Sequence, residues 1–246
     1  MNQRLALVTG GSGGIGAAIC HRLAADGLTV IVGYHRAAEK AETLVAELGG
    51  SPHRAETVDV DDAESLTRLA ASVGAEGGLD VLVNCAGITQ PVPHDDLDGL
   101  DDDLFDRIMR TNVRGPFAVI RALRSALERA ESPVVVNISS VAAVTGQGSN
   151  VAYCASKAAL DSLTRSLGRA LAPQVRVVSV SPGWVLGEYA ARMPAEVIQT
   201  QADLTPMARL ASPADVAAGV SAVVHDLPFT TGSVVPVDGG RPLGVA

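Results

Sequence analysis

The sequence predicts an α/β fold in which helices cover both faces of a doubly wound parallel sheet. Hydrophobic residues make up 47% of the 246 residues and aromatic residues only 3%, so the core has to be built from aliphatic side chains, which suits buried parallel strands. Short β-branched runs alternate with stretches of helical periodicity, which is the pattern of βαβ units. Because no linker or internal repeat interrupts this alternation, we expect a single domain over residues 1–246.

Five apolar runs are expected to form strands. They lie at residues 5–8, 29–32, 81–83, 134–138 and 175–180. Helical periodicity separates these runs, as where Ile15, Ile19 and Leu23 recur four residues apart. A doubly wound sheet binds its ligands at the carboxyl ends of its strands, so we expect functional residues just after the runs.

Composition and charge weigh against several classes of protein. The net charge of −8 disfavours nucleic-acid binding, which depends on clustered Lys and Arg. No apolar run reaches the length of a membrane span, and the N-terminus lacks the features of a signal peptide. Cys20, Cys85 and Cys154 follow neither a zinc nor a disulfide spacing. We therefore expect a cytoplasmic protein with no nucleic-acid or membrane partner.

A glycine-rich loop follows the first expected strand and leads into a helix. It reads Thr9-Gly10-Gly11-Ser12-Gly13-Gly14-Ile15-Gly16. Glycines let the backbone approach a ligand closely, and a helix N-terminus offers N–H groups to a pyrophosphate. The context therefore predicts a Rossmann-like dinucleotide site, with an ordinary glycine-rich connection as the alternative. Two registers fit the loop, G-x-G-x-x-G on Gly11, Gly13 and Gly16, and T-G-x-x-x-G-x-G on Thr9, Gly10, Gly14 and Gly16.

The end of the second strand bears on the choice of cofactor. A site for NAD places a carboxylate there to hold the ribose 2′-hydroxyl, but this chain reads Val32-Gly33-Tyr34-His35-Arg36. Arg36 can pair with a 2′-phosphate through its fork of donors. We therefore favour NADP(H) over NAD(H). A solvated Arg36 without any ligand is the alternative, and Glu39 is a carboxylate that could intervene.

Tyr153 and Lys157 lie four residues apart, on one face of a helix expected over residues 155–171. A phenol is a poor acid or base at neutral pH, and a nearby ammonium shifts its pKa towards a useful value. Ser140 follows the strand at 134–138, where it can hydrogen-bond a carbonyl oxygen as negative charge develops. Each feature has a structural alternative, a chance spacing for the pair and a turn or helix cap for the serine.

The order of these motifs resembles that of the single-domain short-chain dehydrogenase/reductases, most of all their 3-oxoacyl thioester reductase-like members. The glycine loop, Asn84-Cys85-Ala86-Gly87, Asn112, Ser140, Tyr153-x-x-x-Lys157 and Pro182-Gly183 follow one another as in that family. The resemblance covers nearly the whole chain, from Leu5 to the closing Val237-Asp238-Gly239-Gly240. Its motifs are specific to the superfamily and much less specific to a substrate.

The resemblance implies a role for each matching residue. Tyr153 would be the general acid in carbonyl reduction, and Lys157 would also hold the nicotinamide ribose. Ser140 would orient the carbonyl, and Asn112 would support a water-linked proton path to Lys157. Together with Arg36, the residues expected to bind the cofactor are Gly10, Ser12, Gly13, Gly14, Ile15, Gly16, Asp59, Val60, Asn84, Ala86, Gly87, Tyr153, Lys157, Pro182, Gly183 and Val185.

Two of these positions keep a structural alternative. Asp59 could end a strand instead of lying beside the adenine, with Asp61 and Glu64 at capping-box spacing for the next helix. Asn112 falls in a segment expected to be helical, where it could face solvent.

The chain departs from the family pattern at two positions. Cys85 replaces the second Asn of the N-N-A-G turn, a change that we expect to be tolerated. Gly187 stands where the family often has a Thr that anchors the nicotinamide carboxamide. We expect backbone groups of Val185 to serve instead.

The segments outside the motifs give weaker expectations. Residues 186–210 carry no cofactor motif, and we expect them to form a substrate lid. His94, Asp95 and Asp96 lack metal-ligand spacing, so no metal site is expected. Four arginines, at positions 107, 110, 114 and 121, could contact an acidic acyl carrier or coenzyme A, although surface or subunit-interface ion pairs are favoured. By the resemblance, we expect a homotetramer formed through the helices that contain Asn112 and Tyr153.

The leading functional hypothesis is hydride transfer between NADP(H) and a ketone or secondary alcohol. We expect reduction of a small or thioester-linked ketone, such as a 3-oxoacyl thioester. The first alternative is an NAD-dependent sugar, polyol or other alcohol dehydrogenase. A non-catalytic dinucleotide-binding redox sensor is the alternative from another class.

Overall fold

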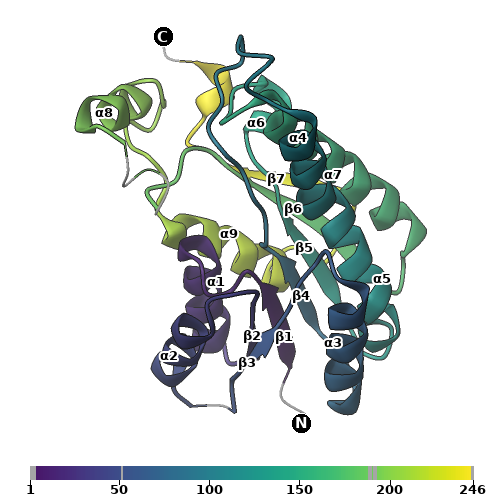
Figure 1. Cartoon of the computed structure of the whole chain (residues 1–246). Helices are drawn as coiled ribbons and strands as arrows, with labels where there is room; N and C mark the ends of the chain where they lie inside the picture. The colour runs from purple at the N-terminus through teal and green to yellow at the C-terminus, as the bar shows by residue number, and fades with distance from the viewer. Residues whose placement is uncertain (1–3, 51, 188–189, 191–192, 245–246) are drawn as a thin grey trace.

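The computed structural model describes residues 4–50, 52–187, 190 and 193–244. Seven parallel strands form one sheet in the order β3-β2-β1-β4-β5-β6-β7, and Figure 1 shows helices on both of its faces. The strands are β1 (Leu5–Thr9), β2 (Thr29–Tyr34), β3 (Arg54–Thr57), β4 (Val81–Asn84), β5 (Val134–Ile138), β6 (Arg176–Pro182) and β7 (Val234–Val237). The doubly wound α/β fold expected from the sequence is confirmed.

The helices connect successive strands across the two faces. They are α1 (Gly14–Ala25), α2 (Ala38–Leu48), α3 (Ala63–Ala75), α4 (Asp102–Met109), α5 (Gly115–Leu127), α6 (Ala142–Thr145), α7 (Val151–Ala170), α8 (Ala195–Asp203) and α9 (Pro213–His225). A π-helical turn, η1 (Arg110–Arg114), joins α4 to α5, and a 3₁₀ turn, η3 (Arg241–Leu243), follows β7. None of the helices in the described part of the chain is long and apolar enough to cross a membrane.

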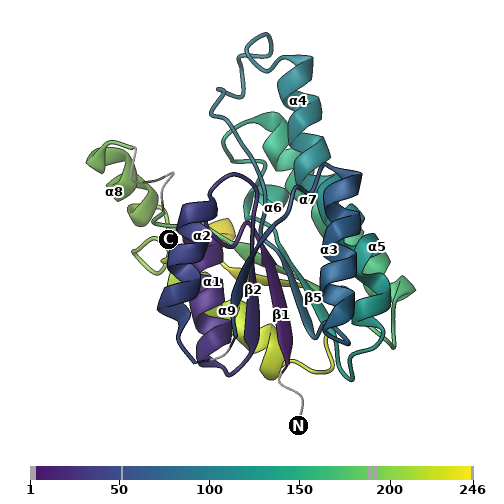
Figure 2. The ribbon, with the colours of Figure 1, turned by 60° about the horizontal axis from the view of Figure 1, so that its bottom comes forward.

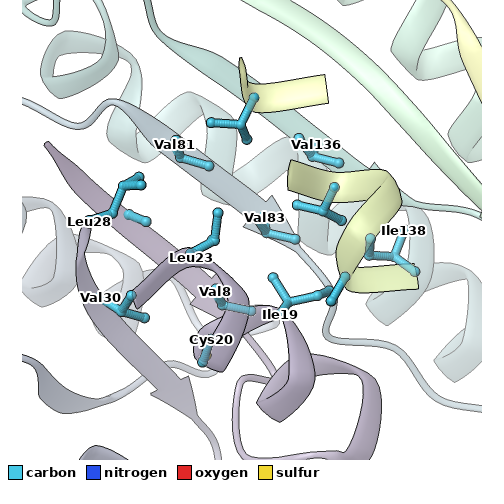
Figure 3. Packing of buried hydrophobic residues seen from close by; sticks show 14 of the residues in the cluster. Val8, Ile19, Cys20, Leu23, Leu28, Val30, Val81, Val83, Val136 and Ile138 are labelled. Carbon is cyan, nitrogen blue, oxygen red and sulfur yellow. The ribbon is translucent and has the colours of Figure 1, made fainter. Parts of the chain in front are cut away.

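Two aliphatic cores hold the three layers together. Successive side chains of a strand point to opposite faces, so Ala6 and Val8 of β1 enter one core and Leu5 and Leu7 the other. The first core packs β1, β2, β4, β5 and β6 against α1, α2 and α9, and Figure 3 shows Ile19 and Leu23 of α1 among its strand residues. The second core lies under α3 and α5, which Figure 2 shows on the opposite face.

All five expected strands are present, but two further strands were not predicted. β3 carries the sequence Arg54-Ala55-Glu56-Thr57 and forms one edge of the sheet. β7 forms the other edge and is only partly buried. An edge strand has a neighbour on one side only and needs no continuous apolar run, which is why the polar β3 was not predicted. β7 does carry an apolar run, but Pro236 interrupts it, and a proline weighs against a strand except at the edge of a sheet.

Two local expectations are corrected by the structure. Helix α7 begins at Val151, four residues before the expected start, because the Asn150 side chain caps it. Asp62 caps α3 through the N–H groups of Glu64 and Ser65, so a capping box on Asp61 and Glu64 is wrong. Asp61 instead accepts hydrogen bonds from the side chains of Thr111 and Arg114.

Candidate functional site

The main cavity of the described chain lies at the carboxyl ends of the strands and has a volume of about 1190 Å³. Its wall combines the glycine loop, the residues that follow β2, β3, β4, β5 and β6, and the start of α7.

The glycine loop forms one end of the cavity. Gly10 adopts φ +65°, and a Cβ on Gly16 would lie 2.2 Å from the carbonyl oxygen of Gly10. These two glycines are therefore required by the tight turn itself. A Cβ on Gly14, by contrast, would meet nothing within 4 Å, and Gly14 faces the cavity together with Ser12 and Gly13. The geometry favours the register that contains Gly10, Gly14 and Gly16.

The N-terminus of α1 opens into the same end of the cavity. Gly13 occupies the N-cap position, no side chain caps the helix, and its first turn carries no acidic residue. The first N–H groups of a helix lack partners within it and favour an anion. The loop thus offers uncapped donors beside glycines that leave room for a close backbone approach, which fits the pyrophosphate of a dinucleotide.

Arg36 and Asp59 lie farther along the cavity wall, after β2 and β3. Arg36 is exposed and forms no ion pair with another described residue. Asp59 lies with one carboxylate oxygen 3.3 Å from Nε2 of His35, and the other oxygen accepts from the N–H of Asp61. This part of the wall therefore carries the Arg36 guanidinium and the Asp59 carboxylate, and both carboxylate oxygens already have partners in the protein.

Ser140, Tyr153 and Lys157 meet at the other end of the cavity. The Ser140 oxygen accepts from the N–H of Ala142 at 3.2 Å, which leaves its hydroxyl hydrogen available to a ligand. Nζ of Lys157 lies 5.6 Å from the centre of the Tyr153 ring. One hydroxyl, one phenol and one ammonium thus share a wall, as general acid–base chemistry on a carbonyl requires.

Lys157 is almost completely buried, at 7% exposure. Its Nζ donates to the carbonyl oxygen of Ile138 at 2.8 Å. Burial lowers the pKa of Lys157 to about 8, against the opposing effects of Cys85 and Asp161. The ammonium can therefore exchange its proton near neutral pH, which suits a residue that tunes Tyr153.

Asn112 lies in the π-helical turn η1, buried at 1% exposure. Its Oδ1 accepts from the N–H of Ile88, and its Nδ2 donates to the Ile88 carbonyl and to Oγ of Ser156. A Cβ on Gly87 would lie 3.2 Å from Oδ1 of Asn112 and 3.9 Å from Nζ of Lys157. A solvent-facing Asn112 is therefore wrong, because the side chain lies behind the wall that carries Lys157.

Comparison with known proteins agrees with this geometry. A family model described as enoyl-(acyl carrier protein) reductase matches residues 10–241. The chain is 33% identical to the 3-oxoacyl-[acyl-carrier-protein] reductase of Staphylococcus aureus strain Mu50, over 96% of each chain. It is 36% identical to cis-4-hydroxycyclohexanecarboxylate dehydrogenase of Sinomonas cyclohexanicum, over 97% of this chain and 96% of that one.

A solved structure gives the same result. The structure of a short-chain dehydrogenase/reductase of the glucose/ribitol dehydrogenase type from Brucella melitensis superposes with a TM-score of 0.90 at 29% identity, covering 97% of this chain and 96% of that chain. The chain belongs to the short-chain dehydrogenase/reductase family. It resembles the 3-oxoacyl-acyl-carrier-protein reductases of that family.

Most of the residues expected from the family motifs line the cavity. They are Gly10, Ser12, Gly13, Gly14, Ile15, Gly16, Arg36, Asp59, Val60, Ala86, Gly87, Ser140, Tyr153, Lys157, Pro182, Gly183 and Val185. Asn84 and Asn112 do not. Nδ2 of Asn84 donates to Oδ1 of Asn137 inside the sheet, because Asn84 is the last residue of a central strand and its side chain points to the neighbouring strand.

The two departures from the family pattern both lie on the cavity wall. Burial raises the pKa of the Cys85 thiol to about 11, so it stays a neutral side chain at physiological pH. A Cβ on Gly187 would meet nothing within 4 Å. The absence of a side chain at position 187 therefore leaves open space in this short-chain dehydrogenase/reductase. The backbone of the nearby Val185 is held by an isolated β-bridge to Ala211.

The expected lid, residues 186–210, is described only in part. Residues 188–189 and 191–192 lie outside the described residues. Helix α8 has no buried residue, and both Figures 1 and 2 show it standing away from the body of the molecule.

Asn150 is a functional candidate that sequence reasoning missed. Its Oδ1 accepts from the N–H of Tyr153 at 2.7 Å, and its Nδ2 donates to the carbonyl oxygen of Gln90 at 2.7 Å. Tyr153 lies in the first turn of α7. Asn150 therefore attaches this turn to the segment that follows β4. An Asn three residues before the tyrosine is an N-cap signal that could have been recognised.

The four arginines at positions 107, 110, 114 and 121 have different surroundings. Arg107 and Arg110 line the cavity, Arg114 pairs with Asp61, and the Arg121 guanidinium lies over the Phe117 ring. Within the described residues, no three His, Cys, Asp or Glu side chains gather as metal ligands do.

Proposed function

We propose that this short-chain dehydrogenase/reductase reduces a ketone to a secondary alcohol with NADP(H), and that Tyr153 is the general acid. The observation that carries the proposal is the single cavity that holds the glycine loop at one end and Ser140, Tyr153 and Lys157 at the other. The reductases and dehydrogenases among its relatives support chemistry at a carbonyl or alcohol carbon.

The cavity fits a nicotinamide dinucleotide. The uncapped start of α1 and the open space at Gly14 suit a pyrophosphate, and Arg36 supplies a cation for a 2′-phosphate. When bound, the reduced cofactor supplies a hydride to the carbonyl carbon. Asp59 does not contradict the choice of NADP(H), because its oxygens are held by His35 and the N–H of Asp61.

The side chains at the other end of the cavity handle the carbonyl oxygen and its proton. Ser140 donates a hydrogen bond to the oxygen and holds it beside the Tyr153 hydroxyl. Tyr153 transfers its proton to that oxygen as the carbon is reduced, so that the ketone becomes an alcohol and the phenol becomes a phenolate. Lys157 stabilises the phenolate by its charge, and Asn112 holds the surrounding backbone.

Several further parts of the proposal rest on similarity. A 3-oxoacyl thioester or similar small ketone is the proposed substrate, with an acyl carrier as a possible partner, because a relative is named for that reaction. We also propose a homotetramer, and a reducing compartment such as the cytoplasm, in keeping with Cys20, Cys85 and Cys154 as free thiols.

The test combines cofactor binding with turnover. Fluorescence titration should show tighter binding of NADPH than of NADH, and a ketone panel should be reduced by the wild type. Tyr153→Phe should bind NADPH normally and lose activity by about 10² to 10⁴-fold, because it lacks the proton donor.

The same measurements separate the alternatives. Much tighter binding of NADH, with oxidation of sugars or polyols, would favour the alcohol dehydrogenase, a reading supported by the galactitol 2-dehydrogenase of Cereibacter sphaeroides among the relatives. Binding of NADPH without turnover of any ketone or alcohol would favour a redox sensor.

A further inference from the structure

A second cavity of about 350 Å³ lies beside the main one. The two cavities share three wall residues, Gln147, Gly148 and Trp184. Gln201 of α8 and Arg241 of η3 also line the second cavity. In Figure 1 the yellow C-terminal segment lies at the same end of the molecule as α6 and α8.

Arg241 is a half-buried cation in this wall. Its guanidinium donates to the main-chain oxygen of Gln201 at 2.8 Å, to Oε1 of Gln201 at 2.6 Å and to Oγ1 of Thr205 at 3.5 Å. All three acceptors are neutral. No carboxylate of a described residue lies within 4 Å of Arg241, whereas the guanidinium of Arg209, in the same region of the sequence, pairs closely with Asp215.

An arginine stays charged in a protein even when it is partly buried. A desolvated charge without a counterion is costly, and a bidentate oxyanion is the partner that a guanidinium matches best. The Gln201 contacts hold the guanidinium in place without neutralising it. His94, Gln147, Trp184 and Leu204 line the rest of this cavity, together with two glycines.

We propose that the second cavity binds a carboxylate carried by the ketone substrate, while the carbonyl of that substrate lies between Ser140 and Tyr153. The inference rests on the proposed reductase function and narrows its substrate to a keto acid. Arg241 is then a specificity-determining residue, positioned by Gln201.

The test compares ketones that differ only in charge. Suitable pairs are 4-oxocyclohexanecarboxylate, 5-oxohexanoate and 7-oxooctanoate, each measured against its carboxamide with NADPH. At the length that spans the two cavities, the wild type should prefer the acid over the amide by about tenfold to a hundredfold in kcat/KM, the range expected for a charged hydrogen bond. Arg241→Gln should bring this ratio close to one.

Two further variants separate charge from folding. Gln201→Glu keeps the arginine but gives it an internal carboxylate, so it should also abolish the preference for acids. Arg209→Gln removes an exposed arginine that lines neither cavity, so it should keep the preference. Thermal unfolding of all three variants verifies that they are folded.

Binding is measured independently of turnover. Trp184 is the only tryptophan of the chain and lines both cavities, so its fluorescence should report the binding of each acid to the NADP⁺ complex. Arg241→Gln should weaken that binding by the same factor as it lowers the kcat/KM ratio.

The outcomes that overturn the proposal differ from those that overturn the reductase function. Equal use of acids and amides by the wild type, or an acid preference that survives in Arg241→Gln, would overturn the carboxylate site alone. If no ketone is reduced, the reductase function fails, and the fluorescence titration still decides whether Arg241 binds the acids.

A phosphate is the other oxyanion that could reach Arg241. Acetoacetyl-coenzyme A carries phosphates and acetoacetyl-N-acetylcysteamine does not. If Arg241→Gln impairs only the coenzyme A thioester and leaves the keto acids unaffected, the site serves the carrier and the carboxylate proposal is overturned.

Discussion

At the residue scale, the two glycines of the loop that face different surroundings should respond differently to the same substitution. Gly16→Ala places a Cβ 2.2 Å from the Gly10 carbonyl oxygen, and the backbone has to move, so we expect a loss of about 1–3 kcal/mol in stability or failure to fold. Gly14→Ala meets nothing and should fold normally while its methyl group obstructs the cofactor, weakening NADPH binding by about tenfold or more. Urea unfolding and fluorescence titration measure the two effects. A Gly14→Ala variant with unchanged NADPH affinity would show that this glycine is not approached by the pyrophosphate.

Lys157 should give the stability of the protein a distinct pH dependence. Its pKa falls from 10.5 in the unfolded chain to about 8 in the fold, so between these values the unfolded state binds more protons and stability rises with pH. Lys157→Met removes the charge. At pH 7 this should raise the free energy of unfolding relative to the wild type by up to about 3 kcal/mol, less a pH-independent loss from the missing hydrogen bond to Ile138. That advantage should disappear as the pH rises from about 8 to above 10.

The measurement is a series of urea unfolding curves for both proteins at pH 7, 8, 9 and 10. Groups away from Lys157 titrate alike in the two proteins, so the difference between them reports Lys157 and the Cys85 thiol that it influences. A constant difference across the series would contradict a depressed pKa.

Residue identity was the most predictable level of the site. Residue type and spacing predicted the chemistry of the loop glycines, Ser140, Tyr153 and Lys157, and the structure brings these residues to one cavity. Asn84 shows what residue type and spacing do not predict. Its side chain bonds to Asn137, 53 positions away, and sequence spacing does not reveal such a partner. The cofactor and catalytic roles themselves stay predictions.

At the scale of elements, the start of α7 controls how Tyr153 is presented. Asn150→Ala removes the helix cap and the hydrogen bond to Gln90, and should cost about 1–2 kcal/mol in stability. The first turn of α7 carries Tyr153, so looser geometry there should also lower kcat by about tenfold or more. Urea unfolding and steady-state reduction of a ketone give the two values.

Ser212→Ala is the matched control for this element. Ser212 caps α9 in a capping box with Asp215 and does not itself line the cavity. It should lose similar stability and keep kcat. If the two variants lose kcat equally, Asn150 acts only through overall stability.

The elements that the sequence failed to predict have separate physical causes. β3 and β7 are edge strands; β3 has few apolar side chains, and β7 contains a proline, which only an edge strand tolerates. The π turn at η1 packs against α4, α5 and α7, and it buries Asn112 in a segment whose sequence looks like an ordinary helix.

At the scale of the whole molecule, the proposed homotetramer should depend on α4, α5 and α7. Phe105 of α4, Phe117 of α5 and Val151 of α7 are exposed apolar side chains, and Figures 1 and 2 show these helices together on one side of the molecule. Phe105→Glu should bury a charge in a subunit interface and shift the mass towards dimer or monomer. Light scattering at micromolar concentration measures the mass. Leu97→Glu changes an even more exposed side chain, in the loop before α4, and should leave the mass unchanged; a monomeric wild type would refute the tetramer.

The sequence by itself determined the fold class, the five central strands and the residues of the cofactor loop and the Ser140, Tyr153 and Lys157 group. These features are local, because apolar runs, glycine spacing and helical spacing are read within a few residues of one another. Only the tertiary structure decided that Asn112 and Asn84 lie behind the cavity wall, that Asn150 anchors the start of α7, and that Arg241 reaches a second cavity beside the first. Those facts depend on contacts between residues far apart in the chain, and packing and burial alone bring such residues together.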